Sequence, residues 1–169
     1  MDERPMEVMQ KTLQVIRKAD PEFKVSLAGN FHKELEADIY DYCIPIGASY
    51  PAEVLARRAQ NNLPTTYYTC CTEAFPNTFT FSDPAEAAGM SYYSAKDQLD
   101  GYLRWAYNSL PKEPLLDSRF EAWAGGDTYL VYPGARSSIR FEKLIEGVQA
   151  HEKITILRKE FTDKKIKNV

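Results

Sequence analysis

The order of the predicted segments indicates an α/β fold, and three observations support that prediction. Some segments carry apolar residues at helical spacing, and others are short runs of β-branched and aromatic residues. The two kinds of segment alternate along the chain, which is typical of parallel strands joined by helical crossovers. Four such units make half of an eight-unit (β/α)8 TIM-type barrel. An open doubly wound sheet is the alternative, but no glycine-rich phosphate loop follows any predicted strand.

The first half of the chain opens with a helix. Residues 5–18 carry apolar side chains every three or four positions, and Pro5 suits a first helical turn. The Ala19-Asp20-Pro21 sequence then ends the helix. The remaining predicted segments of this half are a strand at 23–27, a short helix at 33–37, a strand at 39–46, a helix at 51–61 and a strand at 65–70.

The second half contains a helix at 84–98, opened by Ser82-Asp83-Pro84, and a strand at 102–107. A short strand is predicted at 127–132, closed by Pro133-Gly134, and Ser138 caps a final long helix. We therefore predict a single partial barrel domain over residues 1–169. Its parts are barrel units in 1–108, a loop and strand in 109–134, a terminal helix in 135–160 and a basic tail in 161–169.

Composition excludes several classes of protein. A net charge of -3 argues against a nucleic-acid surface, and no apolar run is long enough to span a membrane. Three cysteines and two histidines lack the spacing of a structural metal site, and we expect neither a metal nor a cofactor. A thiol nucleophile at Cys70-Cys71 would need a nearby histidine, and His32 belongs to a different predicted loop.

Candidate substrate-binding residues follow from the barrel rule, which places active-site groups just past the carboxyl ends of the strands. Aromatic residues make up 12% of the chain, and Tyr and Trp suit both core packing and stacking on sugar rings. A surface role for the lone His32 and a loop-holding role for Asp127 are the alternatives. The selected residues are Asn30, His32, Tyr68, Asn77, Trp105, Tyr107, Asn108 and Asp127.

The adjacent carboxylates Asp2 and Glu3 stand directly before the first predicted helix. Glycoside cleavage requires a proton donor for the leaving oxygen and a second group for the positive charge that develops on the sugar. An Asp-Glu pair can supply both. Acidic residues at this position also complement a helix dipole and cap the helix, so the pair alone leaves both roles open.

Several motifs together resemble the C-terminal catalytic region of glycoside hydrolase family 123, whose type activity is β-N-acetylgalactosaminidase. The resemblance extends from Asp2 to about Ile156, and the order of the motifs makes it specific. The motifs are Tyr67-Tyr68-Thr69-Cys70-Cys71, Pro76-Asn77-Thr78-Phe79, the stretch from Asp100 to Asn108, the stretch from Gly126 to Gly134, Ser137-Ser138-Ile139-Arg140-Phe141-Glu142, and Glu146-Gly147.

The resemblance implies a mechanism and a substrate class. By analogy, Glu3 is the general acid/base and Asp2 holds the 2-acetamido group of the substrate. The acetamido oxygen then attacks the anomeric carbon, which gives an oxazolinium intermediate and net retention. The expected partner is an oligosaccharide or glycan that ends in a β-linked N-acetylhexosamine, with N-acetylgalactosamine favoured.

Family members carry a β-rich domain and the first barrel strands before this catalytic pair, so the chain is expected to be the C-terminal half of a barrel. Half a barrel leaves open strand edges, which a homodimer would cover. We expect little or no turnover from the chain alone. A non-catalytic carbohydrate-binding half-barrel is the alternative, and a flavodoxin-like domain is disfavoured because no phosphate loop is present. The polar start of the chain leaves a periplasmic or extracellular location open for the full-length protein.

Overall fold

The computed structural model describes residues 4–164, which divide into two compact units. The sheet unit contains the residues up to Tyr68 together with Leu99–Leu103. The helix-pair unit contains Thr69–Gln98 and the residues from Arg104 onward. Apolar side chains are buried in both units. The buried residues include Leu27, Tyr42, Ile44 and Tyr67 in the sheet unit, and Ala87, Met90, Tyr129 and Leu130 in the helix-pair unit.

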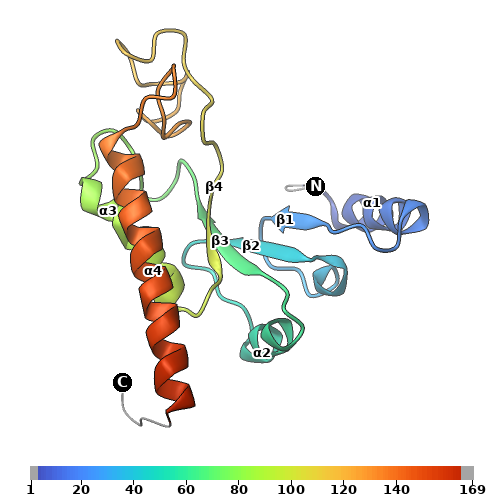
Figure 1. Ribbon diagram of the computed structural model, residues 1–169. Coiled ribbons are helices and arrows are strands. Elements are labelled where there is room, and N and C mark those ends of the chain that lie inside the picture. The colour runs from blue at the N-terminus through green and yellow to red at the C-terminus, as the bar shows by residue number, and fades with distance from the viewer. Residues whose placement is uncertain (1–3, 165–169) are drawn as a thin grey trace. The chain divides into compact units, whose positions relative to one another are not determined.

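A four-stranded parallel sheet confirms the predicted α/β fold. Its spatial order is β1-β2-β3-β4 (Figure 1). Leu27 pairs with Tyr42 across β1 and β2, and Ile44 pairs with Tyr67 across β2 and β3, both in parallel register. Spatial order therefore follows chain order, as it does in a TIM-like arrangement. The strands are β1 (Ser26–Ala28), β2 (Asp41–Pro45), β3 (Thr65–Thr69) and β4 (Gly101–Arg104).

Two α-helices and one 3-10 turn accompany the strands of the sheet unit. They are α1 (Met6–Ala19), η1 (Glu36–Asp38) and α2 (Ala52–Gln60). Arg58 of α2 is fully buried, and its guanidinium donates hydrogen bonds to the carbonyls of Ile39 (3.0 Å), Tyr40 (2.7 Å) and Pro64 (2.7 Å). Glu36 supplies the counter-charge. A buried charge is tolerated here because hydrogen bonds and an ion pair compensate its desolvation.

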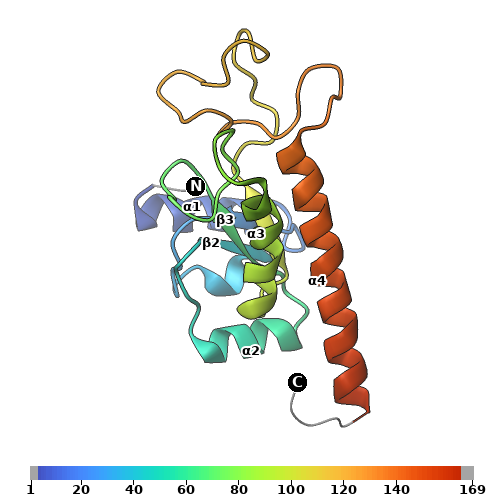
Figure 2. The same ribbon diagram turned by 90° about the vertical axis from the view of Figure 1, so that its left-hand side faces the viewer.

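The helix-pair unit is built on α3 (Pro84–Lys96) and α4 (Ile139–Asp163), which run side by side in both views (Figures 1 and 2). Asp83 caps α3 by accepting a hydrogen bond from Ala85 N at 2.9 Å. Ser138 caps α4 as predicted, accepting from Phe141 N at 3.2 Å. None of the helices between residues 4 and 164 has both the length and the apolar character needed to span a lipid bilayer.

The predicted strand at 127–132 is wrong, because this segment contains turns and only single bridges, Asn108 with Tyr129 and Tyr132 with Arg136. The predicted strand at 102–107 ends early, at Arg104. Both differences have one cause. The backbone beyond Arg104 bonds to the later segment instead of to the sheet, with Leu130 N donating to Tyr107 O at 2.8 Å.

Two further predictions from the first half need correction. The expected helix at 33–37 is a single 3-10 turn, because a five-residue segment is too short to form several α-helical hydrogen bonds. The expected strand at 23–27 is displaced to Ser26–Ala28. Just before this strand, the carbonyl of Val25 accepts from the backbone of Tyr40 at 2.8 Å.

Candidate active site

The predicted catalytic residues Asp2 and Glu3 lie outside the described residues. The described chain begins at Arg4, and α1 follows at Met6 with Pro5 in the N-cap position.

A pocket of about 420 Å³ lies at the carboxyl end of β1 in the sheet unit. We call it the β1-end pocket. Asn30 is exposed and His32 is half-buried, and both line it beside Arg4. Two of the predicted substrate-binding residues thus share a concave site with the residue that directly follows Glu3 in sequence. The complete lining is Arg4, Pro5, Met9, Leu27, Gly29, Asn30 and His32.

The hydroxyl of Tyr42 holds the loop that carries Asn30 and His32. It accepts a hydrogen bond from His32 N at 2.8 Å and donates one to Asn30 O at 3.0 Å. Phe31 packs its ring against Tyr42, with 5.5 Å between the ring centroids. Burial of Tyr42 raises the pKa of its phenol, so the hydroxyl stays protonated at neutral pH and can donate. The loop is consequently positioned by buried groups of β2.

The helix-pair unit contains a second group of predicted residues around a buried ion pair. Asp127 is fully buried and pairs with Arg104, whose side chain is also almost fully buried. Arg104 also donates to the carbonyls of Thr69 (2.9 Å), Cys70 (3.3 Å) and Asp127 (2.5 Å). Its guanidinium therefore ties the end of β3 to the loop around Asp127.

Three predicted residues that follow the end of β4 are exposed to different degrees. The indole nitrogen of Trp105 donates to Asp127 Oδ1 at 3.2 Å, and 41% of Trp105 remains exposed. Tyr107 packs edge-to-face on Phe141, with 5.9 Å between the ring centroids. Asn108 is exposed and bridges to Tyr129. In the sheet unit, Tyr68 of β3 is half-buried. Direct contact between these residues and a substrate stays a prediction.

Asn77 has hydrogen bonds that organise its own loop. It is buried, and its amide group donates to the carbonyls of Glu73 (3.3 Å) and Ala74 (2.9 Å). Its side-chain oxygen accepts from Phe79 N at 3.0 Å and from the hydroxyl of Ser82. These contacts use both ends of the amide within the β3–α3 loop.

Sequence reasoning did not select Arg4 or Arg104 as site residues. Arg104 left a usable signal, because it is a charged side chain between Leu103 and Trp105 in a strand pattern, where a buried charge needs a partner. Arg4 left only its position beside the acidic pair.

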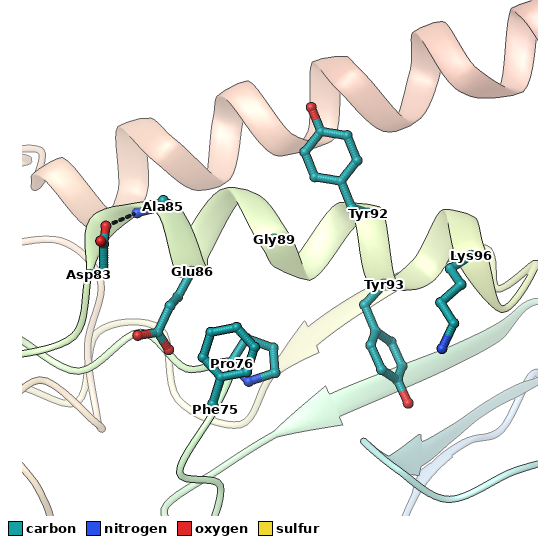
Figure 3. A pocket seen from close by; sticks show the side chains of 9 residues that line it. All are labelled: Phe75, Pro76, Asp83, Ala85, Glu86, Gly89, Tyr92, Tyr93 and Lys96. Atoms are coloured by element: carbon teal, nitrogen blue, oxygen red, sulfur yellow. Dashed lines mark hydrogen bonds between the residues drawn. The ribbon is translucent and has the colours of Figure 1, made fainter.

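A second pocket, of about 550 Å³, lies along α3 and is lined by none of the predicted site residues (Figure 3). Glu86 and Tyr93 extend from the same side of α3 on which Phe75 and Pro76 lie, whereas Tyr92 extends from the opposite side. Both carboxylates that line the pocket bond to backbone: Glu86 accepts from Asn77 N at 2.9 Å, and Asp83 caps the helix. They therefore serve local structure and do not form a pair of free catalytic acids.

The three cysteines differ in accessibility. Cys43 is buried in β2, and burial raises the pKa of its thiol to about 12. Cys70 and Cys71 are half-exposed in the helix-pair unit. Within residues 4–164, no cluster of three or more His, Cys, Asp or Glu side chains is arranged to hold a metal ion.

Iodoacetamide at pH 8 is expected to modify Cys70 and Cys71 well before Cys43 in the folded protein. With a pKa of about 12, only about one Cys43 thiol in ten thousand is ionised at that pH. Time-resolved peptide mass spectrometry would check the order, and unfolding in urea should equalise the three rates. Labelling of Cys43 as fast as Cys70 in the folded chain would contradict its burial.

Comparison with known proteins places the chain in a family. The family model described as "Glycoside hydrolase 123, catalytic domain" matches residues 1–157. Among solved structures, the chain is similar to a family 123 glycoside hydrolase from Clostridium perfringens that was analysed for glycolipid glycan hydrolysis. The TM-score is 0.84 at 29% identity, and the match covers 96% of this chain and 31% of that one. No curated protein matches the chain.

The motifs, the parallel sheet and the family match agree with one another. The chain covers about a third of the length of its structural relative. The family model matches nearly the whole of this chain. The chain therefore belongs to glycoside hydrolase family 123.

Proposed function

We propose that this chain is the C-terminal half of a (β/α)8 barrel that hydrolyses glycosidic bonds in glycans. The observation that carries the proposal is the family match over residues 1–157. The parallel order β1-β2-β3-β4 supports the barrel half, because barrel strands are adjacent in chain order. The β1-end pocket supports the location of the site, since it lies at the carboxyl end of a strand and includes Arg4.

The proposed reaction is substrate-assisted cleavage of a terminal β-linked N-acetylhexosamine, with N-acetylgalactosamine favoured. Glu3 donates a proton to the leaving oxygen as the acetamido oxygen attacks the anomeric carbon and the glycosidic bond breaks. Asp2 orients the acetamido group and stabilises the positive charge of the oxazolinium. Glu3 then takes a proton from a water molecule that attacks the anomeric carbon. This attack opens the oxazolinium ring and gives net retention. Asn30 and His32 are proposed to bind sugar hydroxyl groups in the β1-end pocket.

In the full-length protein, Glu3→Gln is expected to lower kcat/KM for 4-methylumbelliferyl N-acetyl-β-galactosaminide by about 10²- to 10⁴-fold, because kcat/KM reports the bond-cleaving step and the leaving oxygen loses its proton donor. The loss should be much smaller for a 2,4-dinitrophenyl glycoside, whose leaving group needs no protonation. Asp2→Asn should slow both substrates. The comparison of the two leaving groups is measured in one spectroscopic assay.

Glu7→Gln is the matched control, since Glu7 is an exposed carboxylate of the same segment that pairs only with Lys11 among the described residues. It should leave both rates unchanged. If Glu3→Gln lowers kcat/KM equally for the two substrates, Glu3 is not the general acid. If Glu3→Gln binds and turns over substrate like the parent chain, the proposed mechanism is wrong.

The matched part of the chain corresponds to 31% of the Clostridium perfringens chain, and we propose that these residues turn over little or no substrate on their own. Catalytic groups must be held within a fraction of an ångström, which here depends on the carboxyl ends of all barrel strands. A homodimer that covers an open strand edge stays a prediction. Binding of N-acetylgalactosamine that is independent of Glu3, without any turnover, would favour the carbohydrate-binding alternative.

A further inference from the structure

The two tryptophans of the chain lie beside each other in the helix-pair unit. Trp105 is 41% exposed and Trp123 is 38% exposed. Their ring centroids are 5.6 Å apart, with the planes tilted by 56°. We call this pair the tryptophan platform. It presents apolar ring surface to solvent, and contiguous exposed apolar surface is typical of interaction sites and ligand-binding grooves.

Trp105 has a preset orientation. Its indole N–H donates to Asp127 Oδ1 at 3.2 Å, and Asp127 is itself fully buried against Arg104. Arg104 is in turn bonded to the backbone at the end of β3. An acceptor that cannot move fixes the indole before any ligand arrives, so little rotational freedom is lost on binding.

Trp123 sits on a tightly folded loop. Its backbone N–H donates to Phe120 O at 3.0 Å, and Gly126 N donates to Ser118 O at 2.9 Å. A Cβ at Gly125 would stand 2.6 Å from Ser118 Oγ and 2.8 Å from Thr80 Oγ1, so both hydroxyl groups would have to move to admit a side chain there. Close packing of this loop therefore holds the second ring against the first.

We propose that the tryptophan platform binds a pyranose ring of the glycan, with Trp123 as a second stacking residue and Asp127 as the positioning residue for Trp105. The inference rests on the proposed function, which supplies the glycan. The C–H face of a pyranose matches an exposed indole face. Because the indole N–H of Trp105 is already bonded to Asp127, this ring recognises a sugar by its apolar face rather than by a hydroxyl group. Tyr107 and Asn108 follow in sequence and continue the predicted binding residues.

Fluorescence titration with a β-linked N-acetylgalactosamine-terminated tetrasaccharide tests the platform, because all tryptophan emission comes from these two residues. Trp123→Ala is expected to raise the Kd about fivefold or more, because the ligand loses stacking area. Phe81→Ala is the matched control. Phe81 is 72% exposed, and its ring centroid lies 5.3 Å from that of Phe79 in the same unit. Its replacement removes an exposed aromatic ring outside the platform and should leave the Kd unchanged.

The positioning role of Asp127 needs its own readout. Asp127→Leu removes the acceptor of the indole N–H, so it should weaken the coupled near-ultraviolet circular dichroism of the two indoles and raise the Kd. If that variant does not fold, Trp105→Phe answers the question, because it keeps a ring and the Asp127–Arg104 pair but removes the N–H. Trp105→Phe should fold normally and bind the tetrasaccharide several-fold more weakly.

Unchanged Kd values for Trp123→Ala and Trp105→Phe would overturn the platform, whether or not the chain is a hydrolase. Conversely, a chain that shows no Glu3-dependent hydrolysis but binds the tetrasaccharide through the two tryptophans would refute the proposed reaction and support the platform. The two proposals therefore fail separately.

Discussion

Asp127→Ala is expected to lower the free energy of unfolding of the helix-pair unit by about 3–5 kcal/mol. The side chains of Arg104 and Asp127 are 4% and 0% exposed. Removing the carboxylate leaves a buried guanidinium without its counter-charge, and that uncompensated charge costs more than the ion pair itself contributes. Trp105 also loses the acceptor of its indole N–H.

Urea denaturation followed by tryptophan emission measures this effect, because both tryptophans belong to the helix-pair unit. Lys143→Ala is the control. It removes one partner of the exposed Lys143–Glu146 pair, and a pair of that kind contributes about 0–1 kcal/mol. Equal effects of the two substitutions would show that the Arg104–Asp127 pair is solvated in the native state.

A double variant separates the charge from the packing. Replacing Arg104 with Met and Asp127 with Leu removes both charges at once. We expect the double variant to lose less free energy of unfolding than the sum of the losses for Arg104→Met and Asp127→Leu alone. The reason is that neither charge is left alone in the interior.

Gly147→Ala is expected to lower the free energy of unfolding by about 1–3 kcal/mol, although alanine is the better helix former by about 1 kcal/mol. A Cβ at Gly147 would stand 2.6 Å from Ala88 O and 2.9 Å from Ala88 Cα. Those atoms are backbone of α3, so no side-chain rotation relieves the overlap and α4 must move away from α3. Each kcal/mol should lower the Tm by about 2–4 °C in a chain of this size.

Gly89→Ala is the matched control, since Gly89 is also inside a helix but nothing lies within 4 Å of its Cβ position. This change should raise stability by about 0.5–1 kcal/mol through the lower entropy of the unfolded chain. Thermal unfolding of both variants gives the comparison. If both alanines stabilise the protein alike, the helices are not in close contact at Gly147.

The helices could be predicted well because their signals are local. The pattern at 5–18 corresponds to α1, and Ser138 opens α4 as its spacing indicates. Asp83 and Pro84 likewise begin α3. A cap and an apolar period depend on residues within a few positions of each other, so they remain visible in a linear chain.

The segment at 127–132 shows where local signals fail. Thr128–Tyr132 has the β-branched and aromatic composition of a strand, but strand formation needs a partner along its whole length. The segment follows Gly126, whose φ of +78° turns the chain, and its only ladder contacts among the described residues are single bridges. The strand propensity of this segment is therefore not realised, because hydrogen-bond partners are available only at single positions.

By itself, the sequence determined the α/β class, the helices of nine or more residues and the family, because periodicity, caps and ordered motifs are properties of neighbouring residues. The sequence also predicted that Asn30 and His32 lie close together, because both follow the same strand, and both line the β1-end pocket. The tertiary structure decided how the later site residues are held. Arg104 and Asp127 are 23 positions apart, and Trp123 reaches Trp105 across a long loop. Burial of the ion pair selects those contacts, and burial is decided only when distant parts of the chain pack together.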